Sequence, residues 1–180
     1  CAKGVMSAMR HLPRILSIIA LCLGVAACFT SKTPLITPED AAFPFERLVF
    51  QPLGPSEPDT YLLEREGDAY RFSRSGHTDE TALLRLREAG PGMYVVQVLF
   101  ATEDNAASLL LYDVILVGDG NDNFASYAAI KPDGFVPAPG LSLCDSDVCI
   151  TDLNAFVDYV RQRIESGAPS DADYRILERQ

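Results

Sequence analysis

The chain is poor in histidine and in positive charge. It has two histidines, and its 15 Lys and Arg residues face 25 Asp and Glu residues, for a formal net charge of −10. A nucleic-acid-binding surface needs clustered Lys and Arg to neutralise phosphates. A basic patch is also what draws a protein to anionic lipid head groups. The sequence therefore excludes nucleic acid as a partner and offers no electrostatic route to a membrane.

Sequence signatures of several enzyme classes are also missing. The chain has no Gly-x-Ser-x-Gly nucleophile elbow. His77 lies close to Ser75 and Asp79, but a Ser-His-Asp triad is assembled in space, so proximity along the chain is no evidence for one. We expect His77 to be a solvated turn residue. The carboxylates are scattered, and a glycosidase pair requires two of them about 5 to 10 Å apart in a cleft, which a sequence cannot show.

One segment has a faint likeness to a calcium loop. Asp119-Gly120-Asn121-Asp122-Asn123 clusters the oxygen ligands that hard cations prefer. The register of an EF-hand fails, because its sixth position is Phe124 rather than Gly and its twelfth is Ile130 rather than Glu. We expect an ordinary β-turn here and no metal site or cofactor.

The N-terminal region combines a cationic stretch with a short apolar run. Met9 is followed by Arg10, His11 and Arg14, and the run 15–27 is apolar except for a Ser and a Gly. As a helix of about 13 residues the run would span roughly 20 Å, too short for a bilayer core of about 30 Å. A basic segment before a short apolar one is typical of a secretory signal.

The apolar run ends in Val25-Ala26-Ala27-Cys28. Small residues directly before a Cys resemble the lipobox of bacterial lipoproteins. The resemblance implies cleavage that removes residues 1–27, a diacylglyceryl group on the Cys28 thiol and acylation of the new amine, and two or three acyl chains anchor a protein stably. The alternative is a buried helix that ends in an ordinary Cys.

This resemblance also predicts a location. An Asp directly after the lipidated Cys resembles an inner-membrane retention signal, and Phe29 stands there instead, which favours the outer membrane. Three of the 15 basic residues and none of the acidic ones precede Cys28, so the mature chain would carry a net charge of −13. The lipid is then the expected membrane attachment of an exported protein that faces the periplasm.

The cleaved chain is expected to have two parts. Residues 28–42 are polar, interrupted by Pro34 and Pro38, and lack periodicity, which predicts a lipidated tether. Residues 43–180 are expected to form a single β-rich globular domain, and no internal repeat is visible.

Most of this domain has the pattern of strands. Between residues 81 and 87, Ala82, Leu84 and Leu86 alternate with Arg85 and Arg87, which predicts one buried face. Short β-branched and aromatic runs alternate with Gly, Pro, Asn and Asp, as in successive hairpins. The predicted strands are 45–51, 61–65, 69–72, 81–87, 93–101, 108–117 and 124–130, with a Pro-interrupted edge over 135–143 and a last short strand over 174–178.

A helix over about 151–166 is the best-specified element. Leu153, Phe156, Val157, Val160 and Ile164 recur at helical spacing. Thr or Asp can cap its start, and Gly followed by Pro ends it. The sequence thus predicts an α+β fold in which an antiparallel β meander, either a curled sheet or a small barrel, packs against one C-terminal amphipathic helix.

Two cysteines remain after the expected cleavage and lipidation. Cys144 and Cys149 of an exported protein form a natural disulfide, worth about 2 kcal/mol for a loop of about six residues. A redox site is the alternative, but four residues separate the pair rather than the two of Cys-x-x-Cys. A zinc site would need two further ligands, and only His77 remains among the histidines.

Three functions stay open. The anchor and the missing catalytic motifs favour a non-enzymatic envelope protein that binds or scaffolds a partner. A curled sheet with an apolar interior could instead carry a small apolar ligand, as in lipocalin-like barrels, and an apolar cavity of several hundred Å³ would favour that role. An envelope hydrolase is the third hypothesis, and it would require a concave cluster of carboxylates or His77 with perturbed pKa.

Overall fold

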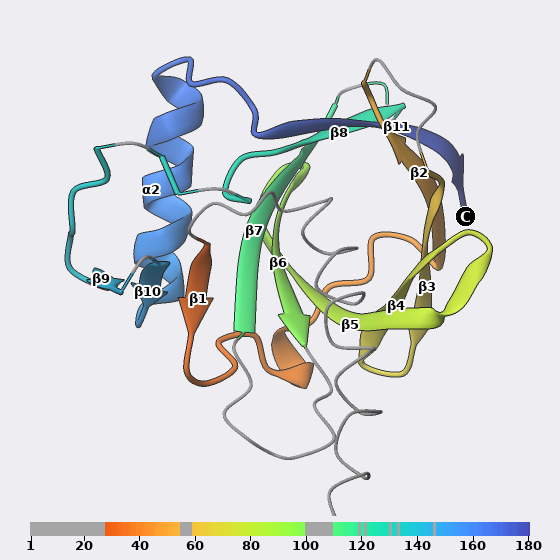
Figure 1. The fold of residues 1–180 in the computed structure, drawn as a ribbon, viewed down its shortest axis with the longest axis horizontal. Helices are drawn as coiled ribbons and strands as arrows, with labels where there is room; N and C mark the ends of the chain where they lie inside the picture. The colour runs from red at the N-terminus through yellow and green to blue at the C-terminus, as the bar shows by residue number, and fades with distance from the viewer. Residues whose placement is uncertain are drawn as a thin grey trace, which may run out of the picture.

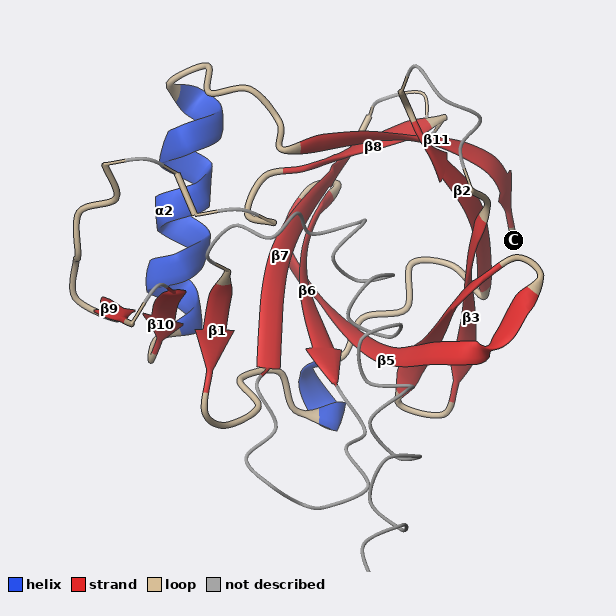
Figure 2. Cartoon of the chain, in the orientation of Figure 1, coloured by secondary structure: helices blue, strands red, loops and turns tan. Residues whose placement is uncertain are grey.

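Eight antiparallel strands close into a barrel in the computed structural model of the chain (Figures 1 and 2). The structure describes residues 28–54, 59–99, 110–118, 120, 122–129, 131–132, 134–145 and 147–180, without the side chains of 77–80. Each strand pairs with the next along the chain, and β11 closes the ring between β8 and β2. The barrel strands are β2 (Arg47–Pro52), β3 (Tyr61–Glu66), β4 (Ala69–Arg74), β5 (His77–Gly90), β6 (Met93–Leu99), β7 (Leu110–Val117), β8 (Asn123–Ser126) and β11 (Ala172–Arg179).

The predicted meander and its helix are confirmed, and the sheet is a closed barrel. Gly67 turns the β3–β4 hairpin and Gly92 the β5–β6 hairpin, both with positive φ, a conformation that Gly adopts without steric cost. Ala82, Leu84 and Leu86 of β5 are buried in the core cluster inside the barrel, as their alternation predicts.

Aromatic side chains fill much of the barrel interior. The Phe50 ring lies 5.7 Å from Tyr61, 5.1 Å from Phe124 and 5.6 Å from Tyr174, measured between ring centroids. Such offset and edge-on contacts add to the stability gained by removing the rings from water. The hydroxyl of Tyr70 donates a 2.6 Å hydrogen bond to the carbonyl of Phe45, which satisfies a polar group within this core.

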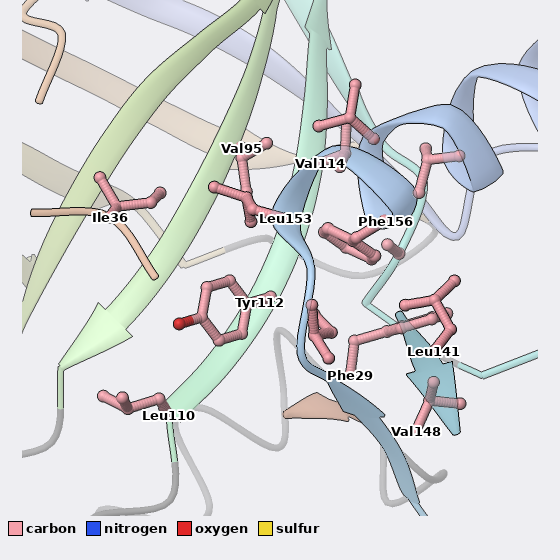
Figure 3. Packing of buried hydrophobic residues seen from close by; sticks show 14 of the residues in the cluster. Phe29, Ile36, Val95, Leu110, Tyr112, Val114, Leu141, Val148, Leu153 and Phe156 are labelled. Carbon is pink, nitrogen blue, oxygen red and sulfur yellow. The ribbon is translucent and has the colours of Figure 1, made fainter. Parts of the chain in front are cut away.

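A second layer, which we call the annex, covers the outer face of β6 and β7 (Figures 1 and 3). Within it β1 pairs in parallel with β10 and antiparallel with β7, so the annex continues the barrel sheet outward. The annex consists of β1 (Phe29–Ser31), the short 3-10 helix η2 (Pro38–Asp40), β9 (Leu141–Cys144), β10 (Asp147–Ile150) and α2 (Leu153–Glu165).

The two layers explain why β7 is apolar on both faces. Leu111 and Ile115 belong to the core inside the barrel, whereas Leu110, Tyr112 and Val114 belong to the core under the annex. A strand that is covered on both sides reads as a continuous apolar run rather than as an alternation. The apolar residues of Leu110–Val117 are therefore equally typical of a strand and of a buried helix.

The helix begins and ends as its sequence predicts. The Asp152 carboxylate accepts hydrogen bonds from the amides of Asn154 at 2.8 Å and Ala155 at 3.3 Å, which satisfies donors that a helix start leaves unpaired. Gly167 follows the last turn with a φ of 78°. Leu153, Phe156, Val157 and Val160 form its buried face.

The tether predicted over residues 28–42 is wrong for most of its length, because this segment is part of the fold. Phe29 and Ile36 are 0% exposed. The fully buried Gln97 of β6 accepts hydrogen bonds from the amides of Leu35 at 2.8 Å and Ile36 at 2.9 Å. The apolar residues here are few and irregularly spaced, so only their distant partners on β6, β7 and α2 reveal that they are buried.

Several strand boundaries also differ from expectation: β5 runs from His77 to Gly90 rather than over 81–87, and the edge expected over 135–143 is the strand β9, Leu141–Cys144. The strand predicted over 124–130 ends at Ser126, where the chain leaves β7 and bends. Asp147–Ile150 forms the strand β10, which the sequence did not indicate. Among the described residues, no helix is both long and apolar enough to cross a membrane.

Candidate functional site

The strand β7 changes its neighbour along one edge, and the candidate site lies at that change. Its first part, Leu110–Tyr112, pairs with β1, and its last part, Ile115–Val117, pairs with β8. Asp113 and Val114 lie between the two pairings. Backbone groups at such a branch lose their regular partners in the sheet, and buried N–H groups need other acceptors.

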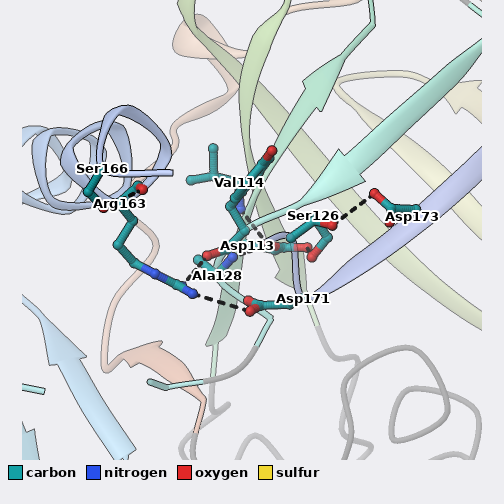
Figure 4. A network of polar contacts seen from close by, with 10 residues as sticks. Asp113, Val114, Ser126, Ala128, Arg163, Ser166, Asp171 and Asp173 are labelled. Carbon is teal, nitrogen blue, oxygen red and sulfur yellow. Dashed lines mark hydrogen bonds and ion pairs between the residues drawn. The ribbon is translucent and has the colours of Figure 1, made fainter. Parts of the chain in front are cut away.

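The carboxylate of Asp113 provides those acceptors (Figure 4). Its Oδ1 accepts from the amides of Val114 at 2.6 Å and Ala128 at 2.9 Å, and its Oδ2 accepts from the Ser126 hydroxyl at 2.7 Å. Asp113 thus joins β7 to the segment that leaves β8. All three donors are uncharged.

Asp113 also borders a cavity inside the barrel. The cavity has a volume of about 110 Å³ and is lined almost wholly by apolar side chains of the barrel core, with Asp113 as the one ionisable carboxylate. Asp113 is half-buried and forms part of the lining of this cavity. The aromatic residues of the lining are Phe50, Phe72, Phe124 and Tyr174.

The surroundings of Asp113 disfavour its charge. Burial raises the pKa of this carboxyl from 3.8 to about 6, the hydrogen bonds from Ser126, Ala128 and Val114 oppose the shift, and the negative charge of Asp171 adds to it. Burial is the largest of these causes, since a carboxylate in apolar surroundings loses its hydration. Asp113 is therefore still ionised at neutral pH, at an energetic cost.

An ion pair connects this place to the helix. Arg163 in the last turn of α2 donates to the carbonyl of Tyr127 at 2.5 Å and lies 3.4 Å from an Asp171 carboxylate oxygen (Figure 4). The amide of Asp171 donates to the carbonyl of Ser126 at 2.7 Å. The guanidinium is thus engaged by Asp171 and by a backbone carbonyl, and it makes no ion pair with Asp113.

Cys28 directly precedes β1 of the annex. Its amide donates to an Asp147 carboxylate oxygen at 2.9 Å, and its carbonyl accepts from the amide of Val148 at 2.9 Å. Burial raises the pKa of its thiol, and the charges of Asp147 and Asp113 raise it further. The thiol is half-buried, is not part of a disulfide, and is disfavoured as a thiolate.

The disulfide predicted between Cys144 and Cys149 is present. It bridges the two strands of the β9–β10 hairpin with a Cα–Cα distance of 5.7 Å. The hairpin turn contains Asp145, which has a φ of 56°, a conformation that costs a non-Gly residue energy. The disulfide therefore constrains a tight hairpin at the outer edge of the annex.

Removing this disulfide is expected to lower stability modestly. The double substitution Cys144→Ser with Cys149→Ser should reduce the free energy of unfolding by about 2 kcal/mol, because the unfolded chain regains the freedom of a loop of about six residues. Urea unfolding of the variant and the oxidised protein measures the difference. Equal midpoints, or two alkylatable thiols at these positions in the non-reduced protein, would contradict the role of the disulfide.

The other predicted candidates do not come together in a site. His77 begins β5 directly after the turn that ends in Gly76, and its side chain lies outside the described part. The segment 119–123, which the sequence predicts as a β-turn, falls partly outside the described residues. Among the residues that are described, no group of three or more His, Cys, Asp or Glu could hold a metal ion.

A larger hollow of about 420 Å³ lies at the rim of the barrel. Its lining mixes backbone and apolar side chains around Leu53, Pro91 and Gly118, with one carboxylate, that of Asp173. That carboxylate already accepts a 2.9 Å hydrogen bond from Ser170. Asn123 is the other polar side chain of this rim hollow. The lumen is the better candidate, because its wall is apolar around one carboxylate, that of Asp113.

Sequence reasoning missed Asp113. It lies within the predicted strand 108–117 and is the one charged residue within the eight of β7, Leu-Leu-Tyr-Asp-Val-Ile-Leu-Val. A single carboxylate in an otherwise apolar strand is a usable signal, since buried charges are rare unless they have a defined role.

In comparisons with models of protein families, with curated proteins and with solved structures, nothing matches this chain.

Proposed function

We propose that the protein is a lipid-anchored, non-enzymatic protein of the bacterial cell envelope that binds a partner protein. In this proposal Cys28 is the lipid attachment site and the closed barrel is a rigid support. The observation that favours a partner-binding role over a carrier role is the small free volume of the lumen. Its cavity of about 110 Å³ is well below the roughly 300 to 1,000 Å³ of sites for drug-sized ligands.

The position of Cys28 is compatible with an anchor. Its thiol is half-buried rather than enclosed, and the residue lies at the start of β1, so a thioether there has a path to the surface. Because Phe29 is already buried, an anchor at Cys28 would hold the annex directly at the membrane without a flexible spacer.

The hydrolase alternative gains no support from the described residues. The carboxylate with the clearest perturbation, Asp113, is committed to three structural hydrogen bonds. The hydroxyl bonded to it, that of Ser126, is 1% exposed and is not part of the cavity lining, so it is not placed to attack a substrate there.

Substitution of Cys28 tests the anchor. Cys28→Ser should either release the protein into the soluble fraction or leave it as an uncleaved precursor, because serine has no thiol to accept the diacylglyceryl group. Membrane fractionation and intact mass measure both outcomes. The variant with Cys144→Ser and Cys149→Ser is the matched control, since it loses two sulfurs and should remain processed and membrane-bound. Normal processing and membrane binding of Cys28→Ser would reject the anchor.

Partner binding needs a separate test. Crosslinking of the lipidated protein in intact envelopes, followed by purification and mass spectrometry, should recover a defined partner at comparable yield in repeated preparations. Asp158→Asn, a change at an exposed residue of α2, provides a control for surface charge. Recovery of nothing beyond the proteins found with an unrelated lipoprotein would argue against the binding role.

A further inference from the structure

We propose that the barrel lumen binds a small alkylammonium ion, whose ammonium group pairs with the Asp113 carboxylate and whose short apolar chain occupies the cavity. The proposal goes beyond the anchored binding role and does not depend on it. It concerns a ligand far smaller than those of typical carrier barrels.

The arrangement of hydrogen bonds leaves a place for one more donor. Oδ1 of Asp113 accepts two backbone amides, those of Val114 and Ala128, whereas Oδ2 accepts only the Ser126 hydroxyl. Each carboxylate oxygen has two lone pairs. Hydrogen bonds from the described residues therefore use three of the four acceptor positions, and the fourth is on Oδ2, the oxygen bonded to Ser126.

The charge at this place is uncompensated. Asp113 makes no ion pair with any described Lys or Arg, and the guanidinium of Arg163 is held by Asp171. A buried carboxylate without a counter-ion is costly. Because the pKa of Asp113 is about 6, the carboxylate is nevertheless ionised at pH 7 to 8, where a primary amine is protonated. A cation in the cavity would offset this cost.

The rest of the cavity suits the other parts of such a ligand. Leu84, Val96 and Val98 offer apolar contacts for a short alkyl chain. The rings of Phe50 and Phe124 border the same cavity, and aromatic rings attract cations. An apolar wall with one carboxylate selects a ligand that has one positive charge and few other polar atoms.

The volume limits the size of the ligand. A cavity of about 150 Å³ holds benzene, with about six non-hydrogen atoms. By that ratio 110 Å³ holds about four, which corresponds to n-propylammonium. Drug-sized molecules exceed the volume of this cavity.

The experiment is a titration of the folded protein with n-propylammonium chloride at pH 7.5, followed by amide chemical shifts in NMR spectra. We expect saturable shifts of the Val114 and Ala128 amides, which donate to Asp113. Asp113→Asn should weaken binding at least about tenfold, the loss expected for a charged hydrogen bond. Uncharged 1-propanol, which has the same size, should bind the protein and this variant equally weakly.

Controls separate the lumen from the acidic surface. Asp158→Asn removes an exposed carboxylate and should leave the affinity unchanged, and 0.3 M NaCl should weaken lumen binding less than surface binding. Equal affinity of the protein and Asp113→Asn for n-propylammonium would overturn the proposal. So would tighter binding of n-hexylammonium, which is too long for the cavity.

A second variant keeps the test valid if Asp113→Asn fails to fold. Ala82 lines the cavity and is buried, so Ala82→Val adds two carbon atoms to the cavity without touching Asp113. This variant should lose n-propylammonium binding while its carboxylate remains. Undiminished affinity in Ala82→Val would show that the ligand binds elsewhere and would also overturn the proposal.

Discussion

Phe29→Ala is expected to reduce the free energy of unfolding by about 3 to 5 kcal/mol, the usual cost of removing a fully buried Phe side chain. Phe29 is 0% exposed. Its ring centroid lies 5.0 Å from that of Phe156 (Figure 3). The centroids of Tyr159 and Phe135 lie 5.8 Å and 6.2 Å away. The substitution would therefore open a cavity between β1, α2 and the loop before β9. Urea unfolding followed by circular dichroism measures the loss.

The stability of Phe29→Ala also tests whether the segment after Cys28 is packed in the core or is a free tether. A residue in a free tether would tolerate the change, whereas a residue of the core would not. Leu177→Ala is the matched control, since Leu177 is 49% exposed on β11 and should change stability by no more than about 0.5 kcal/mol. A Phe29→Ala variant as stable as this control would restore the tether interpretation of residues 28–42.

Asp113→Asn is expected to remove a pH dependence of stability between about pH 4 and 6. The pKa of Asp113 is about 6 in the folded protein and 3.8 in the unfolded reference. The folded state thus holds the proton more tightly, and stability is highest when Asp113 is protonated. Between about pH 4 and 6 the unfolded chain has lost this proton while the folded protein still holds it, so the free energy of unfolding falls as the pH rises. Above about pH 6 both states are ionised and the free energy of unfolding falls no further on account of this group.

The size of this effect follows from the shift. About two pKa units at 1.36 kcal/mol each give up to about 3 kcal/mol between the acidic and neutral limits. Asn keeps a carbonyl oxygen for the amides of Val114 and Ala128 and carries no charge. The stability of Asp113→Asn minus that of the unsubstituted protein should therefore increase with pH from about 4 and level off above about 6.

Urea midpoints measured from pH 4 to 8 provide the test. The difference between the two proteins is the quantity of interest, because other carboxylates titrate in both and cancel. Asp158→Asn, at an exposed position, is the control and should run parallel to the unsubstituted protein at all pH values. A difference between Asp113→Asn and the unsubstituted protein that stays constant from pH 4 to 8 would contradict the burial of the Asp113 charge.

The elements that could be predicted are those specified by short stretches of chain. The β3–β4 hairpin follows from Gly67 between two β-rich runs, and α2 follows from its apolar spacing, its cap at Asp152 and its end at Gly167. In such elements the turn residue or the cap is a neighbour in sequence of the residues that it organises. The Cys144–Cys149 pair is local in the same sense, since the two residues are five positions apart.

The candidate site could not be predicted in this way. Asp113 was visible as a charge in an apolar strand, but its partners Ser126 and Ala128 become its neighbours only because β8 leaves β7 at that point. The cavity beside it is likewise formed by side chains from several barrel strands. A local sequence pattern predicts neither the point at which one strand leaves another nor the space that remains between side chains of distant strands.

The sequence by itself determined an antiparallel β meander with one helix, the local disulfide and the acidic net charge. Tertiary structure alone decided that the sheet closes through the β11–β2 pairing and that Phe29 and Ile36 are core residues. The physical reason is the separation along the chain of the residues that interact. Turns, caps and alternation act between residues close in sequence, whereas closure and burial depend on contacts between distant segments.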